Sequence, residues 1–205
     1  MIAIIDYGVG NLFSLSSSLQ AIGQEAVVTS DKDVIKAADR IILPGVGAFA
    51  DAIAKLKSTG LDEVVVSEAK KGKPIMGICL GMQLLFEKSY EYGEHSGLGL
   101  IKGSIVPIKD IVDSTFKIPH IGWNAIYHNK THELLKYTPN GEFVYFVHSY
   151  FADKCDDSLL TYTEYGEKIT ASVVHKNVYG VQFHPEKSGN VGLNILRAFC
   201  EWEVI

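Results

Sequence analysis

The feature that most constrains the fold is an alternation of short apolar runs with helical patterns in the first half of the chain. Apolar runs at residues 2–5, 26–28, 40–43 and 74–78 predict buried strands, and the stretches 12–22, 49–56, 61–69 and 80–86 predict helices. Apolar strands joined by helices indicate βαβ crossovers and a parallel sheet covered on both faces. Ligand sites in such sheets lie at the carboxyl ends of the strands.

The second half of the chain is richer in short strands. Strand-like runs separated by Gly, Asn and Asp turns occupy residues 104–108, 123–127, 143–147, 160–164, 171–175 and 178–183. A closing helix is expected over about residues 190–202. Because no repeat, linker or charge block divides the chain, we expect one α/β domain, residues 1–205. Its sheet is expected to be mostly parallel and flanked by helices, with a β-rich second half.

Composition argues against several classes of protein. The net charge is −5 and only two residues are arginines, whereas nucleic-acid surfaces need clustered Arg and Lys to neutralise phosphates. No apolar run approaches the ~18 residues of a membrane span. The first positive residue is Lys32, so no secretory signal is expected. Three widely spaced cysteines (Cys79, Cys155 and Cys200) fit a reducing cytosol, and we expect a cytoplasmic protein.

The strongest chemical signal is the segment Gly77-Ile78-Cys79-Leu80-Gly81, where a predicted strand turns into a helix. This is the nucleophile-elbow pattern with Cys in place of Ser. A nucleophile there sits on a tight turn with unusual backbone angles, and the flanking glycines remove side chains that would clash. The start of the next helix supplies N–H groups that favour a thiolate and an oxyanion. Cys79 is the expected nucleophile; the alternative is a buried structural cysteine.

A cysteine nucleophile needs a base, and the base needs an orienting group. His184 and Glu186 are two residues apart, which in an extended segment directs both side chains to one face, and Pro185 stiffens the link. Glu186 is then able to accept a hydrogen bond from His184 and fix its tautomer. The alternative is a solvent-facing His-Pro-Glu turn.

Two glycine-rich loops follow the predicted strands. The segment Gly8 to Phe13 is similar to a dinucleotide fingerprint, but Phe13 stands where a third glycine is needed, so a loop exposing Asn11 is preferred. The segment Pro44-Gly45-Val46-Gly47 ends the third strand. Its glycines permit a backbone N–H to point towards Cys79, with a plain strand-to-helix turn as the alternative.

The remaining histidines do not predict a metal site. His128 and His132 are four residues apart, but a turn is predicted between them and no third ligand lies nearby. His120 and His148 flank apolar strands and are expected to be partly buried structural residues. We therefore expect no metal and no cofactor.

At these residues the chain resembles the class I glutamine amidotransferases, and specifically the glutaminase subunits of imidazole glycerol phosphate synthase. The Gly-x-Cys-x-Gly and His-Pro-Glu signatures are typical of the superfamily. The start Asp6 to Asn11 and the segment Pro119 to Asn124 are similar to the histidine-biosynthesis members. The resemblance covers nearly the whole chain and implies a single-domain class I glutamine amidotransferase (flavodoxin-like) fold.

The same resemblance implies a site and a reaction. Cys79 is expected to attack the side-chain amide of L-glutamine, His184 to transfer the proton, and Glu186 to orient His184, giving ammonia and then glutamate through a thioester. The backbone amides of Leu80 and Val46 are the implied oxyanion donors. The residues implied to hold glutamine are Gly47, Gln83, Glu91, Ser149 and Tyr150.

The resemblance also implies a partner. In the family that the chain resembles, the ammonia is used to make imidazole glycerol phosphate and AICAR on a (β/α)₈-barrel cyclase of about 250 residues. The present 205 residues leave no room for such a barrel, so we expect a separate cyclase chain in a heterodimer. Asn11, Trp123 and Lys187 are expected to dock onto it, with a core position as the alternative for Trp123.

Two other classes of function compete with this interpretation. A non-enzymatic α/β binding module with an inert Cys79 predicts no unusual thiol reactivity. A cysteine peptidase or a free-standing glutamyl hydrolase on the same scaffold predicts turnover of substrates other than glutamine.

Overall fold

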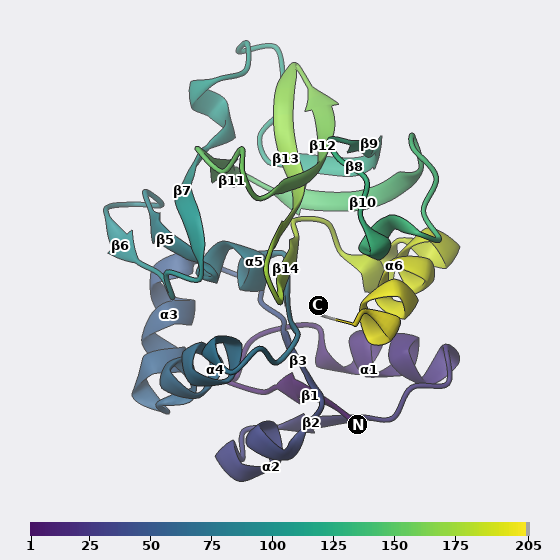
Figure 1. Ribbon diagram of the computed structural model, residues 1–205. Coiled ribbons are helices and arrows are strands. Elements are labelled where there is room, and N and C mark those ends of the chain that lie inside the picture. The colour runs from purple at the N-terminus through teal and green to yellow at the C-terminus, as the bar shows by residue number, and fades with distance from the viewer. Residues whose placement is uncertain (204–205) are drawn as a thin grey trace.

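The fold is built around an eight-stranded sheet, shown in Figure 1, whose strands lie in the order β2-β1-β3-β4-β14-β13-β12-β9. The computed structural model describes residues 1–203. The strands β1 (Ile2–Ile5), β2 (Ala26–Thr29), β3 (Arg40–Leu43), β4 (Ile75–Ile78) and β14 (Val178–Val181) pair in parallel. Their carboxyl ends therefore meet at one edge, as predicted.

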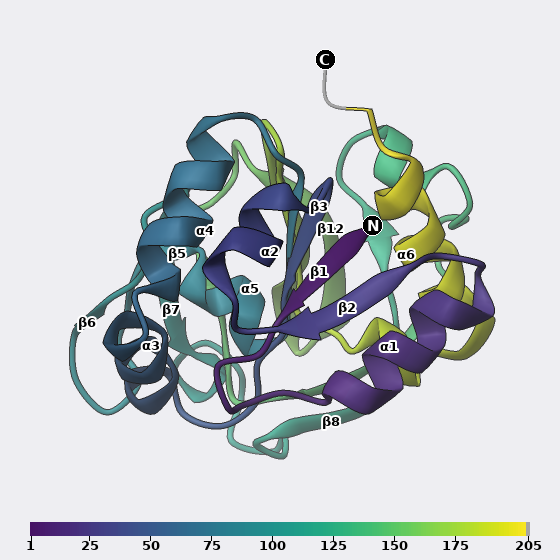
Figure 2. The same cartoon turned by 90° about the horizontal axis from the view of Figure 1, so that it is seen from below.

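Helices cover both faces of this sheet (Figure 2). One face carries α2 (Lys32–Ala37), α3 (Phe49–Ser58) and α4 (Leu61–Lys70); the other carries α1 (Leu12–Ala21) and α6 (Gly189–Glu201). Successive residues of a strand point to opposite faces. Ala3 and Ile5 accordingly pack with the first group of helices, whereas Ile2 and Ile4 pack with the second. All four residues of β1 are therefore buried, two against each group of helices.

The second half of the chain extends the sheet and adds two smaller ones. The antiparallel strands β13 (Glu167–His175), β12 (Leu159–Tyr165) and β9 (Tyr127–His128) continue from β14. The strands β8 (His120–Ala125) and β10 (Phe143–His148) form an antiparallel pair. A four-stranded sheet contains β5 (Phe86–Ser89), β6 (His95–Ser96), β7 (Ile101–Pro107) and β11 (Tyr150–Asp153). Single 3₁₀ turns occupy Ile108–Asp110, Glu133–Leu135 and Pro185–Lys187.

The predicted elements of the parallel half are confirmed, with two corrections. The helix predicted over residues 80–86 is α5 (Leu80–Leu84), because the fully buried Phe86 begins a strand that pairs with Ile101. Helix α2 was not predicted. It has only six residues, too few for a clear apolar period, and it is held by Asp31, which accepts hydrogen bonds from the amides of Asp33 and Val34.

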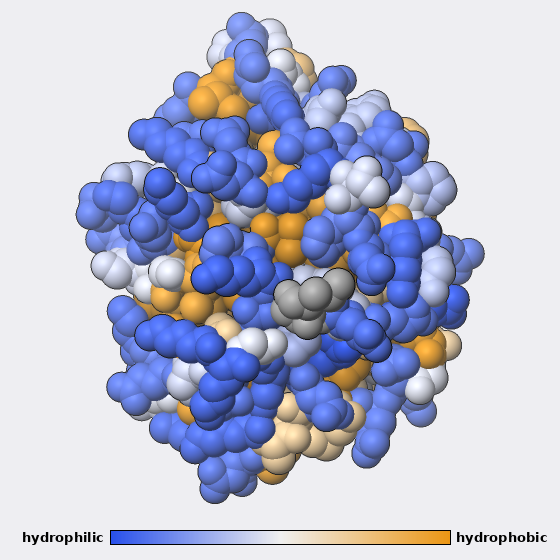
Figure 3. All heavy atoms as spheres, viewed as in Figure 1, coloured by the Kyte–Doolittle hydropathy of each residue, from blue (hydrophilic) through white to orange (hydrophobic). Residues whose placement is uncertain are grey.

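The β-rich half departs further from the prediction. Strand β8 begins at His120, three residues before the predicted start, and the strands β5, β6 and β11 were not predicted. These strands are short and pair with segments distant in sequence, so local composition gives only a weak signal. Figure 3 shows a mainly hydrophilic face with scattered apolar residues. Within residues 1–203, no helix is long and apolar enough to cross a membrane.

Candidate active site

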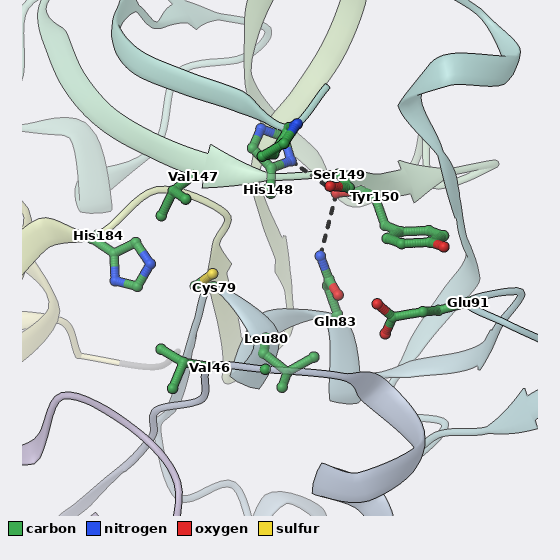
Figure 4. Close-up of a pocket in the computed structure, with 12 residues that line it drawn as sticks. Val46, Cys79, Leu80, Gln83, Glu91, Val147, His148, Ser149, Tyr150 and His184 are labelled. Atoms are coloured by element: carbon green, nitrogen blue, oxygen red, sulfur yellow. Dashed lines mark hydrogen bonds between the residues drawn. The ribbon is translucent and has the colours of Figure 1, made fainter. Parts of the chain in front are cut away.

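A cavity of about 300 Å³ opens at the carboxyl ends of the parallel strands (Figure 4). It is lined by side chains from both halves of the chain, including the β10–β11 connection. The predicted site residues that line it are Val46, Gly47, Cys79, Leu80, Gln83, Glu91, Ser149, Tyr150 and His184. Glu186 reaches the same site by hydrogen bonding to His184. The structure thus brings the predicted nucleophile, base, orienting acid, oxyanion donors and glutamine-holding residues together.

Cys79 sits on the predicted strained turn between β4 and α5. Its backbone has φ 54° and ψ −112°, values that few residues other than glycine adopt. The backbone amide of Cys79 donates to the Val181 carbonyl at 2.8 Å, which fixes the turn against β14. The side chain is 7% exposed and faces the cavity, with the imidazole of His184 opposite the sulfur (Figure 4).

The glycines on either side of Cys79 permit close backbone packing. A Cβ atom on Gly77 would lie 2.7 Å from the Met82 amide, and one on Gly81 would overlap the Leu43 carbonyl oxygen at the end of β3. The loop after β3 fits against the same turn, since a Cβ on Gly45 would lie 2.8 Å from the Gly81 amide. The elbow and this loop therefore pack backbone against backbone.

Replacing Gly81 with alanine is expected to lower the free energy of unfolding by about 1–3 kcal/mol, because the added methyl group forces two backbone segments apart. Denaturant unfolding measures the effect as a lower midpoint at an unchanged slope. An unchanged midpoint would contradict the packing of the elbow.

His184 and Glu186 form a buried pair. His184 Nδ1 lies 2.8 Å from Glu186 Oε1, and the two side chains are 2% and 3% exposed, so the solvent-facing turn is wrong. The segment is not extended as predicted, because residues 185–187 form a 3₁₀ turn. Burial opposes a charge on His184, but interactions with Cys79 and Glu186 outweigh it and raise the pKa of His184 to about 10.

The turn that carries this pair is held against β10. The His184 amide donates to the Tyr145 carbonyl at 3.0 Å. Ser188 Oγ accepts from the Tyr145 amide at 3.0 Å and donates to the His184 carbonyl at 2.6 Å. These contacts fix the imidazole over the elbow without using its ring nitrogens.

The loop Pro44 to Gly47 follows β3 and lies beside Cys79. The hydroxyl of Tyr7 donates to the Pro44 carbonyl at 2.8 Å, which ties the loop to the segment after β1. Gly47 has φ +96°, a value that suits glycine. Val46 is 42% exposed and borders the cavity.

Gln83 and Glu91 have defined partners in the cavity wall. Gln83 Nε2 donates to the Tyr150 carbonyl at 3.3 Å and to Gln182 Oε1 at 3.0 Å, leaving the side-chain oxygen of Gln83 for another donor. Glu91 Oε2 accepts from the Phe49 amide at 2.5 Å, at the start of α3. Figure 4 shows both side chains directed into the cavity on the side away from His184.

Sequence reasoning missed residues that support this site. Gln182 Nε2 lies 3.8 Å from Cys79 Sγ, and Gln182 is fully buried. Its signal is a single amide within the apolar run before His184. Tyr7 gave no signal of its own, because its contact with Pro44 joins residues 37 apart in sequence.

The residues expected to meet a partner separate into two groups. Trp123 is 53% exposed, so a core position is wrong, and its ring meets Tyr145 edge-on at 6.0 Å. Lys187 Nζ lies 5.9 Å from the centre of the same Tyr145 ring. Asn11 is half-buried and borders a small cavity together with His184 and Glu186. Trp123 and Lys187 thus share one surface, while Asn11 lies closer to the candidate catalytic pair.

His128 and His132, which are four residues apart, do not lie in one element. His128 lies on β9, and His132 Nδ1 accepts from the Leu134 amide at 3.2 Å. In the part of the chain that the structure describes, no three His, Cys, Asp or Glu side chains gather as metal ligands would.

Comparison with known proteins identifies the family. The family model for class-I glutamine amidotransferases matches residues 3–201. The HisH subunit of imidazole glycerol phosphate synthase from Lactococcus lactis is 51% identical over 201 residues, covering 98% of each chain. The same subunit from Aquifex aeolicus is 50% identical over 198 residues, covering 96% of this chain and 94% of its own length. The chain belongs to the HisH family of class-I glutamine amidotransferases.

Solved structures confirm the predicted amidotransferase fold. PurLQS from Thermotoga maritima aligns with a TM-score of 0.73 at 22% identity, covering 97% of this chain and 96% of that one. Another glutamine amidotransferase aligns with a TM-score of 0.76 at 16% identity, covering 98% of both. Membership of this HisH family favours an enzyme over the binding module with an inert Cys79.

Proposed function

We propose that this chain is a glutaminase that hydrolyses L-glutamine to glutamate and ammonia, acting as one domain over residues 1–205 in the cytoplasm. The observation that carries the proposal is Cys79, held at φ 54° in the wall of a cavity that His184, of the buried His184–Glu186 pair, also lines. The HisH relatives are named as subunits of imidazole glycerol phosphate synthase. We extend that assignment to this chain.

The first half of the reaction forms a thioester. Cys79 gives its proton to His184, and the sulfur attacks the side-chain amide carbon of glutamine. The resulting oxyanion is stabilised by the backbone amides of Leu80 and Val46, each contributing about 3 kcal/mol. His184 returns the proton to the amide nitrogen, the C–N bond breaks, and ammonia leaves. The carboxylate of Glu186 stabilises the imidazolium that forms between the two transfers.

The second half releases glutamate. A water molecule gives a proton to His184 and attacks the thioester carbon through the same oxyanion site. The C–S bond then breaks, and His184 returns the proton to the sulfur. Gly47, Gln83, Glu91, Ser149 and Tyr150 are proposed to hold the substrate, because they line the cavity. Gln83, Glu91 and Tyr150 lie on its side away from His184 (Figure 4). Glu91, as a carboxylate, suits the α-ammonium group of glutamine.

Ammonia release also calls for a partner, because free ammonia becomes protonated and is lost to solvent. We propose a separate (β/α)₈-barrel cyclase that forms a heterodimer with this chain and uses the ammonia to make imidazole glycerol phosphate and AICAR in histidine biosynthesis. The proposed docking surface contains Trp123 and Lys187 and continues towards Asn11. Exposed apolar side chains of Ile121 and Phe143, 57% and 55% exposed, lie on the same strand pair as Trp123.

Replacing Trp123 with alanine is expected to weaken cyclase binding by at least about 10-fold, because a large exposed aromatic is a typical interface anchor. Titration of labelled protein with a cyclase from a relative measures the affinity. Synthesis driven by glutamine should fall, while synthesis driven by added ammonium salts should persist. If the variant keeps both the cyclase affinity and the glutamine-driven synthesis of the parent, the docking assignment is overturned.

The glutaminase assignment itself is tested by measuring ammonia released from glutamine, with and without that cyclase. A faster release from glutamine than from asparagine or from glutamine-free peptides is expected. Turnover of peptides or γ-glutamyl chains in place of glutamine would favour the peptidase or glutamyl hydrolase. Absence of all turnover, with and without the cyclase, would favour a binding module.

A further inference from the structure

Two buried histidines beside the cavity have no part in the proposed reaction. His120 on β8 is fully buried, and His148 at the end of β10 is 6% exposed. They face each other across the strand pair, with His120 Nδ1 3.0 Å from His148 Nε2. His148 Nδ1 lies 2.8 Å from the Tyr150 carbonyl oxygen, and His120 Nε2 lies 2.9 Å from Asn124 Oδ1. Four groups thus form one continuous chain of contacts.

The surroundings of the pair favour two neutral imidazoles. Burial lowers the pKa of His120 and lowers that of His148 to about 3. The rings of Tyr165 from β12 and Phe146 from β10 stack on His120, with centroids 4.0 and 5.0 Å away. The positive charge of a protonated His184 also lowers the pKa of His148, because it disfavours a second positive charge nearby.

Because each neutral imidazole carries one ring proton, the donor and acceptor at every hydrogen bond of this series are fixed. A carbonyl oxygen only accepts, so His148 Nδ1 carries a proton and donates to Tyr150. His148 Nε2 must accept from His120 Nδ1, and His120 Nε2 must in turn accept. The side chain of Asn124 completes the chain by turning its amide nitrogen to His120. Without the turn, two acceptors would meet at 2.9 Å; with it, Asn124 Oδ1 faces the Glu164 carbonyl oxygen in place of Nδ2, which is 3.4 Å from that oxygen, and the longer distance makes this the weaker repulsion.

The chain ends on a carbonyl that belongs to the cavity wall. The Tyr150 carbonyl accepts from His148 and also from Gln83 Nε2, and both contacts appear in Figure 4. Ser149 and Tyr150, which join β10 to β11, line the cavity. With both hydrogen bonds in place, this connection has one orientation relative to Gln83.

We propose that His148, oriented by His120 and Asn124, is a positioning residue that fixes the Ser149–Tyr150 wall for glutamine binding. This inference rests on the proposed glutaminase function. It assigns His148 no proton transfer. It also links the glutamine pocket to Asn124, the neighbour of Trp123 on β8.

Two substitutions at His148 separate the hydrogen bond to Tyr150 from the bulk of the ring. His148→Leu removes the donor, and we expect the KM for glutamine to rise on the order of 10-fold with kcat within about 3-fold. His148→Asn places an N–H where Nδ1 stood and should keep KM within about 3-fold of the parent. His175→Asn is the matched control: His175 is exposed at the end of β13 and does not line the cavity, so both constants should stay unchanged.

The tautomers provide a test that does not depend on turnover. In ¹⁵N-histidine NMR at neutral pH, both His120 and His148 should be neutral and protonated at Nδ1. Asn124→Leu, which removes the donor to His120, tests the chain from its far end and should raise KM less than His148→Leu.

Two results would overturn the proposal: a proton on His148 Nε2 in the parent protein, or equal KM values for the Leu and Asn variants at His148. If His148→Leu does not fold, the proposal is tested by the tautomers of His120 and His148 and by the KM of the Asn124→Leu variant. A parent protein without glutaminase activity but with the expected tautomers would overturn the proposed function and leave the hydrogen-bond chain intact.

Discussion

Replacing Cys79 with alanine is expected to reduce ammonia release from glutamine by at least about 10⁴-fold, to background. No other group in the proposed mechanism forms the thioester, so the loss is of the whole covalent pathway. The fold should persist, because alanine is smaller than cysteine and the turn tolerates a β-carbon at φ 54° already. A coupled ammonia assay measures the activity, and thermal unfolding checks the fold.

The other cysteines are matched controls for this variant. Burial raises the pKa of Cys155 to about 11 and that of Cys200 to about 11, so both thiols are protonated at neutral pH. Cys155→Ala and Cys200→Ala should retain activity. Iodoacetamide should label Cys79 faster than either of them, and equal labelling of all three in the folded protein would contradict the elbow argument.

Replacing Glu186 with glutamine is expected to lower kcat on the order of 10³–10⁴-fold with little loss of fold. The amide keeps the shape of the side chain but removes the charge that stabilises the imidazolium and selects its tautomer. Steady-state kinetics measures the loss, with Glu201→Gln on the surface as a charge-matched control. Near-native turnover would reduce Glu186 to a turn residue.

The same variant has a defined effect on pH dependence. The folded-state pKa of His184, about 10, lies above its ordinary value of 6.5, so the folded protein binds the proton more tightly. The resulting stability is fully present below about pH 6.5 and is lost as the pH rises through 10. Glu186→Gln should lower the pKa of His184 and flatten this decline. Denaturant unfolding between pH 6 and 10 measures both slopes, and parallel slopes would contradict the coupling.

The site was predictable from sequence where function rests on short segments. The elbow around Cys79 lies within five residues, so spacing and turn chemistry predict its geometry. The two-residue spacing of His184 and Glu186 likewise predicts their contact, although the segment between them forms a 3₁₀ turn and not the expected extended chain. Contacts between distant segments left no such signal. The chain from Asn124 to Tyr150 and the contact of Gln182 with Cys79 depend on strand pairing that composition does not specify.

The fold shows the same division. Apolar runs predicted the parallel strands, most clearly where a strand such as β1 is buried on both faces. The end of α5 was predicted two residues too late because pairing of Phe86 with Ile101 outweighs the helical pattern. Trp123 shows that exposure at a surface is harder to predict than a strand. The local sequence Gly122-Trp123-Asn124 is compatible with a tryptophan in the core and with one that faces solvent.

The glycine contacts around Cys79 have a consequence for redesign of the substrate range. Behind Cys79, main chain packs on main chain, with Gly81 against the end of β3 and Gly45 against Gly81. Side-chain mutagenesis therefore has almost nothing to remodel there. The opposite wall consists of replaceable side chains, among them Gln83, Glu91 and Tyr150. Libraries that seek a shorter or longer amide substrate should vary that wall alone, and the reacting centre should then keep its geometry from one variant to the next.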